Sequence, residues 1–142
     1  MKEGISVFST HATDILLNEK GEILSQQPGG PIIFIEDVLR KSGVPFNSYH
    51  GDTVNVEILI TPDGEFGRVP KAPQSLVIPF SEIIDDLIII STLLSDWDFS
   101  QIETFHGKAF VDIQGFVRDG GDFGNKRVWK ESKNFTGWAS TP

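Results

Sequence analysis

A mostly apolar stretch, from Ile83 to Leu94, constrains the fold of this chain more than any other feature. A strand needs such a sequence when both of its faces are buried, as in the centre of a parallel sheet. Its longest apolar run, Leu87 to Leu94, is interrupted by Ser91 and Thr92 and is far shorter than the ~20 residues of a membrane helix. We therefore expect the central strand of an α/β protein and no membrane span.

The clearest helix of the sequence follows a pair of glycines, Gly29 and Gly30. Pro31 suits the first helical position, apolar side chains recur at helical spacing, and Gly43 stands where a C-terminal cap belongs. This pattern predicts a helix of about three turns between Pro31 and Gly43.

Several other segments have the composition of β-strands, and the order strand, helix, strand is typical of an open sheet with parallel crossovers. We therefore expect an open, mostly parallel sheet with flanking helices, and a small β-layer beside it formed by residues 44–49 and 54–60. A capping-box pattern at Ser100 and Glu103 predicts a short helix that Gly107 ends. The remaining expected strands cover residues 5–10, 23–27 and 109–113.

Two aspartates are expected at carboxyl ends of strands, where open α/β sheets bind their ligands. Residues 11–14 are predicted to be a turn, so that Asp14 lies just beyond the first strand, and Asp112 lies near the end of the last. Gly29 and Gly30 would let a ligand approach the backbone at a helix N-terminus. Each feature has an ordinary alternative, because such glycines and aspartates are common in turns without function.

Composition excludes several classes of function. Twelve Lys and Arg against twenty Asp and Glu give a net charge of −8, so we expect neither nucleic acid nor a membrane surface as a partner. The chain has no cysteine, and its three histidines show no metal-ligand spacing. It lacks a nucleophile elbow and a Walker A motif, and it opens without a signal-peptide pattern, so we expect a cytoplasmic protein.

The character of the chain changes near residue 119. Residues 1–118 hold 8 basic and 17 acidic side chains, whereas residues 119–142 hold 4 basic and 3 acidic ones. Four glycines and aromatic residues without a regular period mark the second part. We predict an α/β domain over 1–118, followed by a polar, Gly-rich tail or loop over 119–142.

A strand ending near Asp14, the Gly29-Gly30 helix, and the stretch from Asp112 to Arg118 together resemble the ribokinase-like (PfkB) family of carbohydrate and nucleoside kinases. The resemblance covers residues 5–118 and corresponds to the N-terminal portion of such an enzyme. It implies a central α/β sheet with a small β-sheet lid, whose strands would be those around residues 23–27 and 54–69.

The resemblance also implies a reaction, the transfer of a phosphoryl group from Mg-ATP to a hydroxyl of a sugar or nucleoside. Asp14, Gly29 and Gly30 would bind the substrate. The phosphoryl-transfer side would hold Asp112, Gln114 and Arg118, since the planar guanidinium of an arginine suits phosphate. Phe34 stands where family members often place a substrate-binding Asn, so ribose is not the expected acceptor.

The catalytic parts that the resemblance implies are missing from these 142 residues. In the family, the general base belongs to a Gly-Ala-Gly-Asp turn, and that turn and the nucleotide pocket lie in the C-terminal half. We therefore expect no catalytic residue, no metal ligand, no good nucleotide site and no sugar phosphorylation by this chain alone. An open sheet edge predicts self-association or pairing with the missing half. The alternatives are a non-catalytic module that binds a small polyol or a protein, and a domain whose Gly and Asp residues are only turns.

Overall fold

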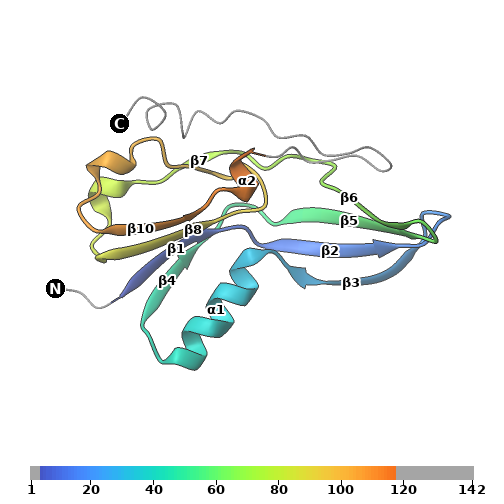
Figure 1. Ribbon diagram of the computed structural model, residues 1–142, viewed down its shortest axis with the longest axis horizontal. Coiled ribbons are helices and arrows are strands. Elements are labelled where there is room, and N and C mark those ends of the chain that lie inside the picture. Colours follow the sequence, from blue (N-terminus) through green and yellow to red (C-terminus); the bar gives the residue numbers. More distant parts are fainter. Residues whose placement is uncertain (1–3, 118–142) are drawn as a thin grey trace.

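The computed structural model describes residues 4–117, and its centre is a four-stranded parallel sheet, which we call sheet A. This arrangement confirms the expected α/β fold with a mostly parallel sheet (Figure 1). In spatial order the strands are β10 (Lys108–Asp112), β8 (Leu87–Ser91), β1 (Ile5–Ser9) and β4 (Phe46–Tyr49).

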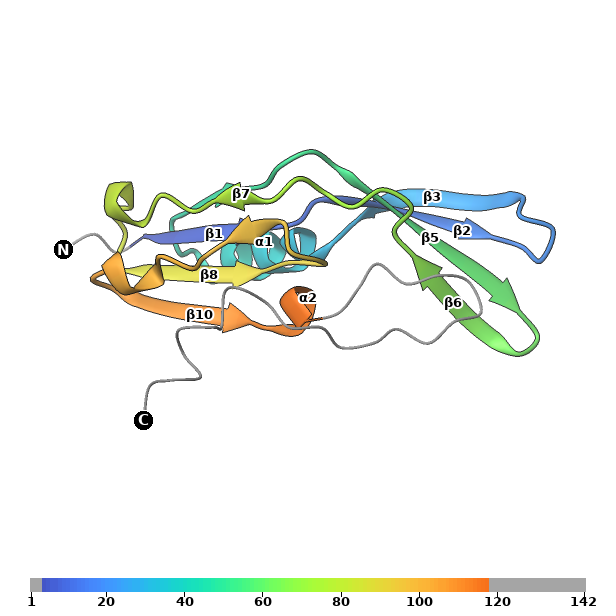
Figure 2. The same ribbon diagram turned by 90° about the horizontal axis from the view of Figure 1, so that it is seen from above.

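A second four-stranded sheet, sheet B, extends from the carboxyl end of sheet A (Figures 1 and 2). In spatial order its strands are β3 (Ile23–Gly29), β2 (Ala12–Leu17), β5 (Val54–Thr61) and β6 (Gly64–Arg68). Strand β2 follows β1 after only two residues and pairs antiparallel with β3 and parallel with β5, and β5 pairs antiparallel with β6.

Helix α1 (Pro31–Ser42) confirms the predicted helix and its signals. Gly43 ends the helix with a left-handed backbone, φ 71°, and its N–H donates to the Arg40 carbonyl oxygen at 3.2 Å. Ile32 and Leu39 are buried on the side that faces β1 and β4. The helix is fixed to β4 by a hydrogen bond from Ser48 Oγ to Glu36 Oε1, 2.5 Å long.

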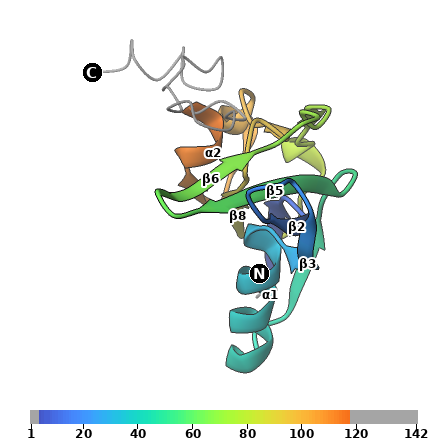
Figure 3. The same cartoon turned by 90° about the vertical axis from the view of Figure 1, so that its right-hand side faces the viewer.

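The hydrophobic core lies on one face of sheet A and centres on Ile88, Ile90 and Phe8. Phe99 and Ile78, both buried, cover these strands from segments that follow sheet B in the sequence. In Figure 3, α1 lies in the lower part of the view and α2 (Gln114–Val117) in the upper part, with β8 and β5 between them. The covering segments are β7 (Leu76–Val77), β9 (Trp97–Asp98) and the 3-10 turns Phe80–Glu82 and Ile102–Thr104.

Two expectations about the strands were wrong. Residues 11–14 do not form a turn, because the chain re-enters a sheet at Ala12, and Asp14 is the third residue of β2. The segment expected at 44–49 does not belong to the small β-layer. Its ordered part, β4, pairs in parallel with β1 and closes one edge of sheet A as the structure describes it.

Two further elements are shorter than the sequence predicts. The apolar run forms a strand only over β8, where Ile88 and Ile90 are fully buried while Ile89 on the other face is half-buried. The helix expected after Ser100 is a single 3-10 turn without a side-chain cap, because only six residues lie between Ser100 and Gly107. The predicted tail at 119–142 lies outside the described residues.

Candidate functional site

The structure brings Asp14, Gly29 and Gly30 together at the carboxyl end of sheet A. Asp14 of β2 lies against Gly29 of the neighbouring β3, because a Cβ added at Gly29 would lie 2.6 Å from Asp14 Cγ and 2.7 Å from Oδ1. Gly30 has φ 87° and passes so close to Thr10 that its Cβ would overlap the Thr10 carbonyl oxygen. Gly30 therefore needs glycine for both space and backbone conformation, whereas a side chain at Gly29 would displace the Asp14 carboxylate.

The carboxylate of Asp14 is half-buried, and none of the residues in 4–117 donates a hydrogen bond or forms an ion pair with it. Burial raises the pKa of this carboxyl above its ordinary value, because the charged form loses water that nothing replaces. A ligand that donates hydrogen bonds, such as a polyol, would supply what the surroundings lack.

The N-terminus of α1 begins directly beside this carboxylate. Gly30 is the N-cap residue, no side chain caps the helix, and its first turn holds no acidic residue. The Ile32 N–H reaches the Thr10 carbonyl oxygen at 3.4 Å, which ties the helix start to the end of β1. The positive end of the helix dipole thus lies near Asp14, and no acidic side chain of the first helical turn offsets it.

Asp112 and Gln114 also lie at the carboxyl end of sheet A, but they are apart from Asp14. Asp112 ends β10, where its carboxylate accepts hydrogen bonds from Ser91 Oγ at 3.2 Å and from the Gln114 N–H at 3.1 Å. Two strand spacings separate β10 from β1, about 10 Å in all. Arg118 lies outside the described residues, so the predicted phosphoryl-transfer side is described only in part.

A buried hydrogen-bonded pair that the sequence did not indicate, Thr10 and Asp96, links the end of β1 to the loop after β8. Thr10 Oγ1 donates to Asp96 Oδ2 at 2.5 Å, and the N–H of Leu94 donates to Oδ1 at 3.1 Å. Burial raises the pKa of Asp96, and these hydrogen bonds oppose the rise. No sequence signal relates the two residues, because 86 positions separate them.

Phe34, the residue in the place of the family's asparagine, lies in α1 with 72% of its surface exposed. It is one helical turn from Gly30, the residue that packs against the Thr10 backbone. An exposed aromatic ring here offers an apolar surface instead of a hydrogen-bonding amide.

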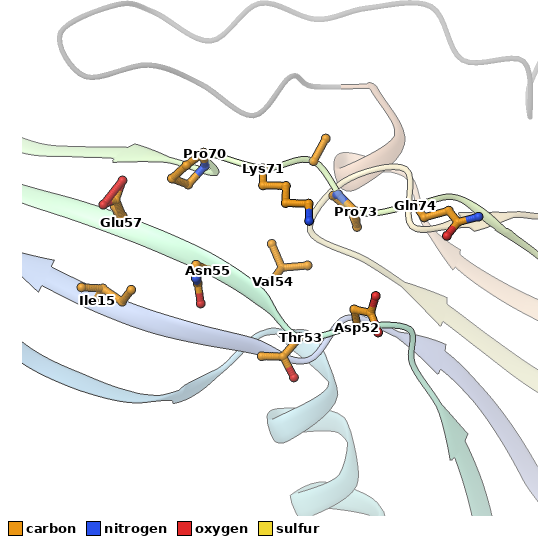
Figure 4. A pocket seen from close by; sticks show the side chains of 11 residues that line it. Ile15, Asp52, Thr53, Val54, Asn55, Glu57, Pro70, Lys71, Pro73 and Gln74 are labelled. Atoms are coloured by element: carbon orange, nitrogen blue, oxygen red, sulfur yellow. The ribbon is translucent and has the colours of Figure 1, made fainter.

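A separate cavity of about 410 Å³ lies between β5 and the segment that follows β6 (Figure 4). Figure 4 shows Lys71 and Asn55 among the side chains that line it. Ile15 and Glu57, which are paired in register, also line it, and Asp14 points to the opposite face of sheet B because strand neighbours alternate. This cavity is therefore distinct from the site at Asp14.

No three side chains of His, Cys, Asp or Glu within 4–117 are grouped so that they could hold a metal ion. Among the helices of that part of the chain, none has the length and apolar character to cross a membrane.

The fold is similar to solved structures of ribokinase-family kinases. One is a pyrophosphate-dependent kinase complexed with a pyrophosphate analogue and myo-inositol; it has a TM-score of 0.57 and 15% identity, over 89% of this chain and 54% of that one. A sulfate complex of a pyrophosphate-dependent kinase of the family has a TM-score of 0.50 and 15% identity, over 88% of this chain and 55% of that one. A third structure is a pyrophosphate-dependent myo-inositol-1 kinase converted into a myo-inositol-3 kinase by two substitutions. It has a TM-score of 0.51 and 18% identity, over 88% of this chain and 52% of that one.

These comparisons show a ribokinase-like fold, and the chain spans about half the length of the structures it matches. Neither a scan against models of protein families nor a search of curated protein sequences finds a match.

Proposed function

We propose that this chain is the substrate-binding portion of a ribokinase-like phosphotransferase that acts on a hydroxyl group of a small sugar, nucleoside or cyclitol. One observation carries the proposal: a half-buried carboxylate, Asp14, has no partner among the described residues and lies against Gly29, beside the start of α1. Open α/β folds bind ligands at the carboxyl ends of their parallel strands, which is where this carboxylate lies.

The chemistry of the site suits a ligand with neighbouring hydroxyls. Both oxygens of an ionised carboxylate accept hydrogen bonds, and each bond from a hydroxyl to a charged group contributes about 1.5–3 kcal/mol. Gly29 leaves room for the Asp14 carboxylate, and Gly30 lets the backbone pass close to Thr10, so the two glycines hold the carboxylate beside the start of α1. The exposed ring of Phe34 would pack against the apolar face of a sugar or cyclitol.

The phosphoryl donor would bind on the side of Asp112 and Gln114. Arg118 would contact it there, and the C-terminal half that the resemblance implies would supply the rest of the donor site. The resemblance implies Mg-ATP as the donor. The neighbours in structure are described as pyrophosphate-dependent, which makes pyrophosphate a second donor to test. Sheet B, whose strand β2 carries Asp14 near its start, would act as the lid over the substrate.

Isothermal titration of the chain with myo-inositol, fructose, ribose and adenosine tests the proposal. We expect saturable binding of at least one polyol, and loss of that binding in Asp14→Asn. The control is Asp63→Asn, which removes the same charge from the exposed turn between β5 and β6. Equal binding by Asp14→Asn and the wild type, or no binding of any polyol, would contradict the proposal.

A separate assay addresses the reaction itself. The chain alone, with Mg-ATP or with pyrophosphate, is expected not to phosphorylate the polyol that binds, because its sequence lacks the Gly-Ala-Gly-Asp turn in which the resemblance places the general base. Steady turnover by purified chain would show that the catalytic parts lie within these residues.

A further inference from the structure

A cavity of about 570 Å³ lies on the core face of sheet A, between the edge strand β4 and the segment that contains β7. Its volume is that of an ordinary small-molecule pocket. Ser6 and Phe8 of β1 form its floor, on the face of the sheet opposite to the one that α1 covers. A ligand held here would therefore not occupy the site at Asp14.

Aromatic rings form one wall of this cavity. The rings of Phe8 and Tyr49 are stacked, with centroids 5.1 Å apart and planes 18° apart, and Trp97 meets Phe8 edge-on at the same centroid distance. Tyr49 is 45% exposed, whereas Phe8 and Trp97 are buried, so the stack ends in a ring with one open face. Such a face attracts a flat apolar ring and, through its quadrupole, a cation.

A buried carboxylate, that of Asp85, lines the cavity beside this wall. Its residue is 7% exposed, and Oδ2 accepts a hydrogen bond from Ser6 Oγ at 2.7 Å. No residue among 4–117 donates to Oδ1 or forms an ion pair with this carboxylate. A buried carboxylate with one donor is costly, because a charge taken from water needs several hydrogen bonds or a counter-ion.

The charge of the lining is of one sign. Glu82 adds a second carboxylate at the rim, and the cavity has no Lys, Arg or His among its lining residues. The positive partner that Asp85 lacks is thus not supplied by the walls. Ser6 and Asn47 add uncharged polar side chains to the lining, and apolar Val77 and Ile84 are exposed.

We infer that this cavity binds a small molecule with a flat apolar ring and a protonated amine. The ring stacks on Tyr49, and the ammonium group donates hydrogen bonds to Asp85, with Glu82 adding to the attraction. Charge-assisted hydrogen bonds of this kind account for most of the selectivity, because the ring alone would bind amines and acids equally.

Tryptamine and 3-indolepropionate test the inference, because they share a ring and differ in charge. Binding to the full chain is followed by shifts of backbone amide resonances, and by the thermal midpoint, which rises with a ligand that prefers the folded state. We expect tryptamine to bind at least about tenfold more tightly than 3-indolepropionate. Equal affinities, or no saturable shift with millimolar tryptamine, would overturn the inference.

Two variants locate the binding. Asp85→Asn keeps an acceptor for Ser6 and should weaken tryptamine binding about tenfold or more, whereas Asp86→Asn, at the exposed neighbouring position, should leave it unchanged. Val77→Arg places a cation at the opening, at a side chain that is 59% exposed, and should block tryptamine without unfolding the chain. Undiminished binding in both Asp85→Asn and Val77→Arg would place the tryptamine elsewhere and refute the site.

Discussion

Replacing Gly29 by alanine tests the contact on which the candidate site depends. The added Cβ would lie 2.6 Å from Asp14 Cγ and 2.7 Å from Oδ1, far inside ordinary contact distance. The backbone of Gly29 is outside the left-handed region, so the cost is one of space alone. The Asp14 side chain must turn aside, and overpacking of this kind costs about 1–3 kcal/mol of stability.

Gly30→Ala, the neighbouring substitution, meets a different obstacle. Its φ of 87° with ψ 162° is a backbone conformation almost confined to glycine, and any side chain there costs about 1–3 kcal/mol. Its Cβ would also overlap the Thr10 carbonyl oxygen, which is backbone and cannot turn aside. Adding the overpacking cost gives a loss of about 2–6 kcal/mol, larger than the loss at Gly29.

A double-mutant cycle separates the two causes. Urea unfolding followed by circular dichroism gives the free energy of unfolding of each variant, with and without Asp14→Ala. Because Asp14→Ala removes the atoms that a Cβ at Gly29 would meet, it should restore about 1–2 kcal/mol to Gly29→Ala and nothing to Gly30→Ala. If Asp14→Ala restores neither variant, or both equally, Asp14 does not lie against Gly29 and the proposed site fails.

Burial raises the pKa of Asp14, so the wild type should lose stability relative to Asp14→Asn as the pH rises from the ordinary value of 3.8 through the raised pKa; unfolding at pH 3 to 7 checks the sign. Asp96→Ala leaves the Thr10 hydroxyl without its buried acceptor and should cost about 1–3 kcal/mol in urea. Phe99→Ala should cost about 3–5 kcal/mol, whereas Phe110→Ala, at a side chain 72% exposed, should cost almost nothing; equal losses would contradict the core assignment.

The sequence predicts well the elements that carry their own local signals. Pro31 and Gly43 delimit α1 because each acts on the backbone at its own position, and the fold of the β5–β6 hairpin follows from alternation and a turn. The structure also brings Asp14 to Gly29 and Gly30, although the binding of a substrate there remains a prediction.

Features that depend on distant pairing could not be predicted in this way. The segment at Ala12 has the polar residues of a turn, and it becomes a strand because β3 and β5 pair with it from both sides. The Thr10–Asp96 pair and the buried Asp85 likewise depend on chain segments that meet only in the folded state. Propensity is a weak guide where tertiary pairing decides the conformation.

Several hydrogen bonds hold the junction between β1 and β2, at the end of sheet B next to sheet A. The Thr10 hydroxyl is bound to Asp96 and to the N–H of Leu93, and the His11 carbonyl oxygen accepts the N–H of Val54 at 3.0 Å. His11 Nδ1 also lies 3.0 Å from Thr53 Oγ1. If sheet B closes over a substrate, it must bend along its length and not rotate as a rigid body about the β1–β2 junction, because these hydrogen bonds hold the junction in place.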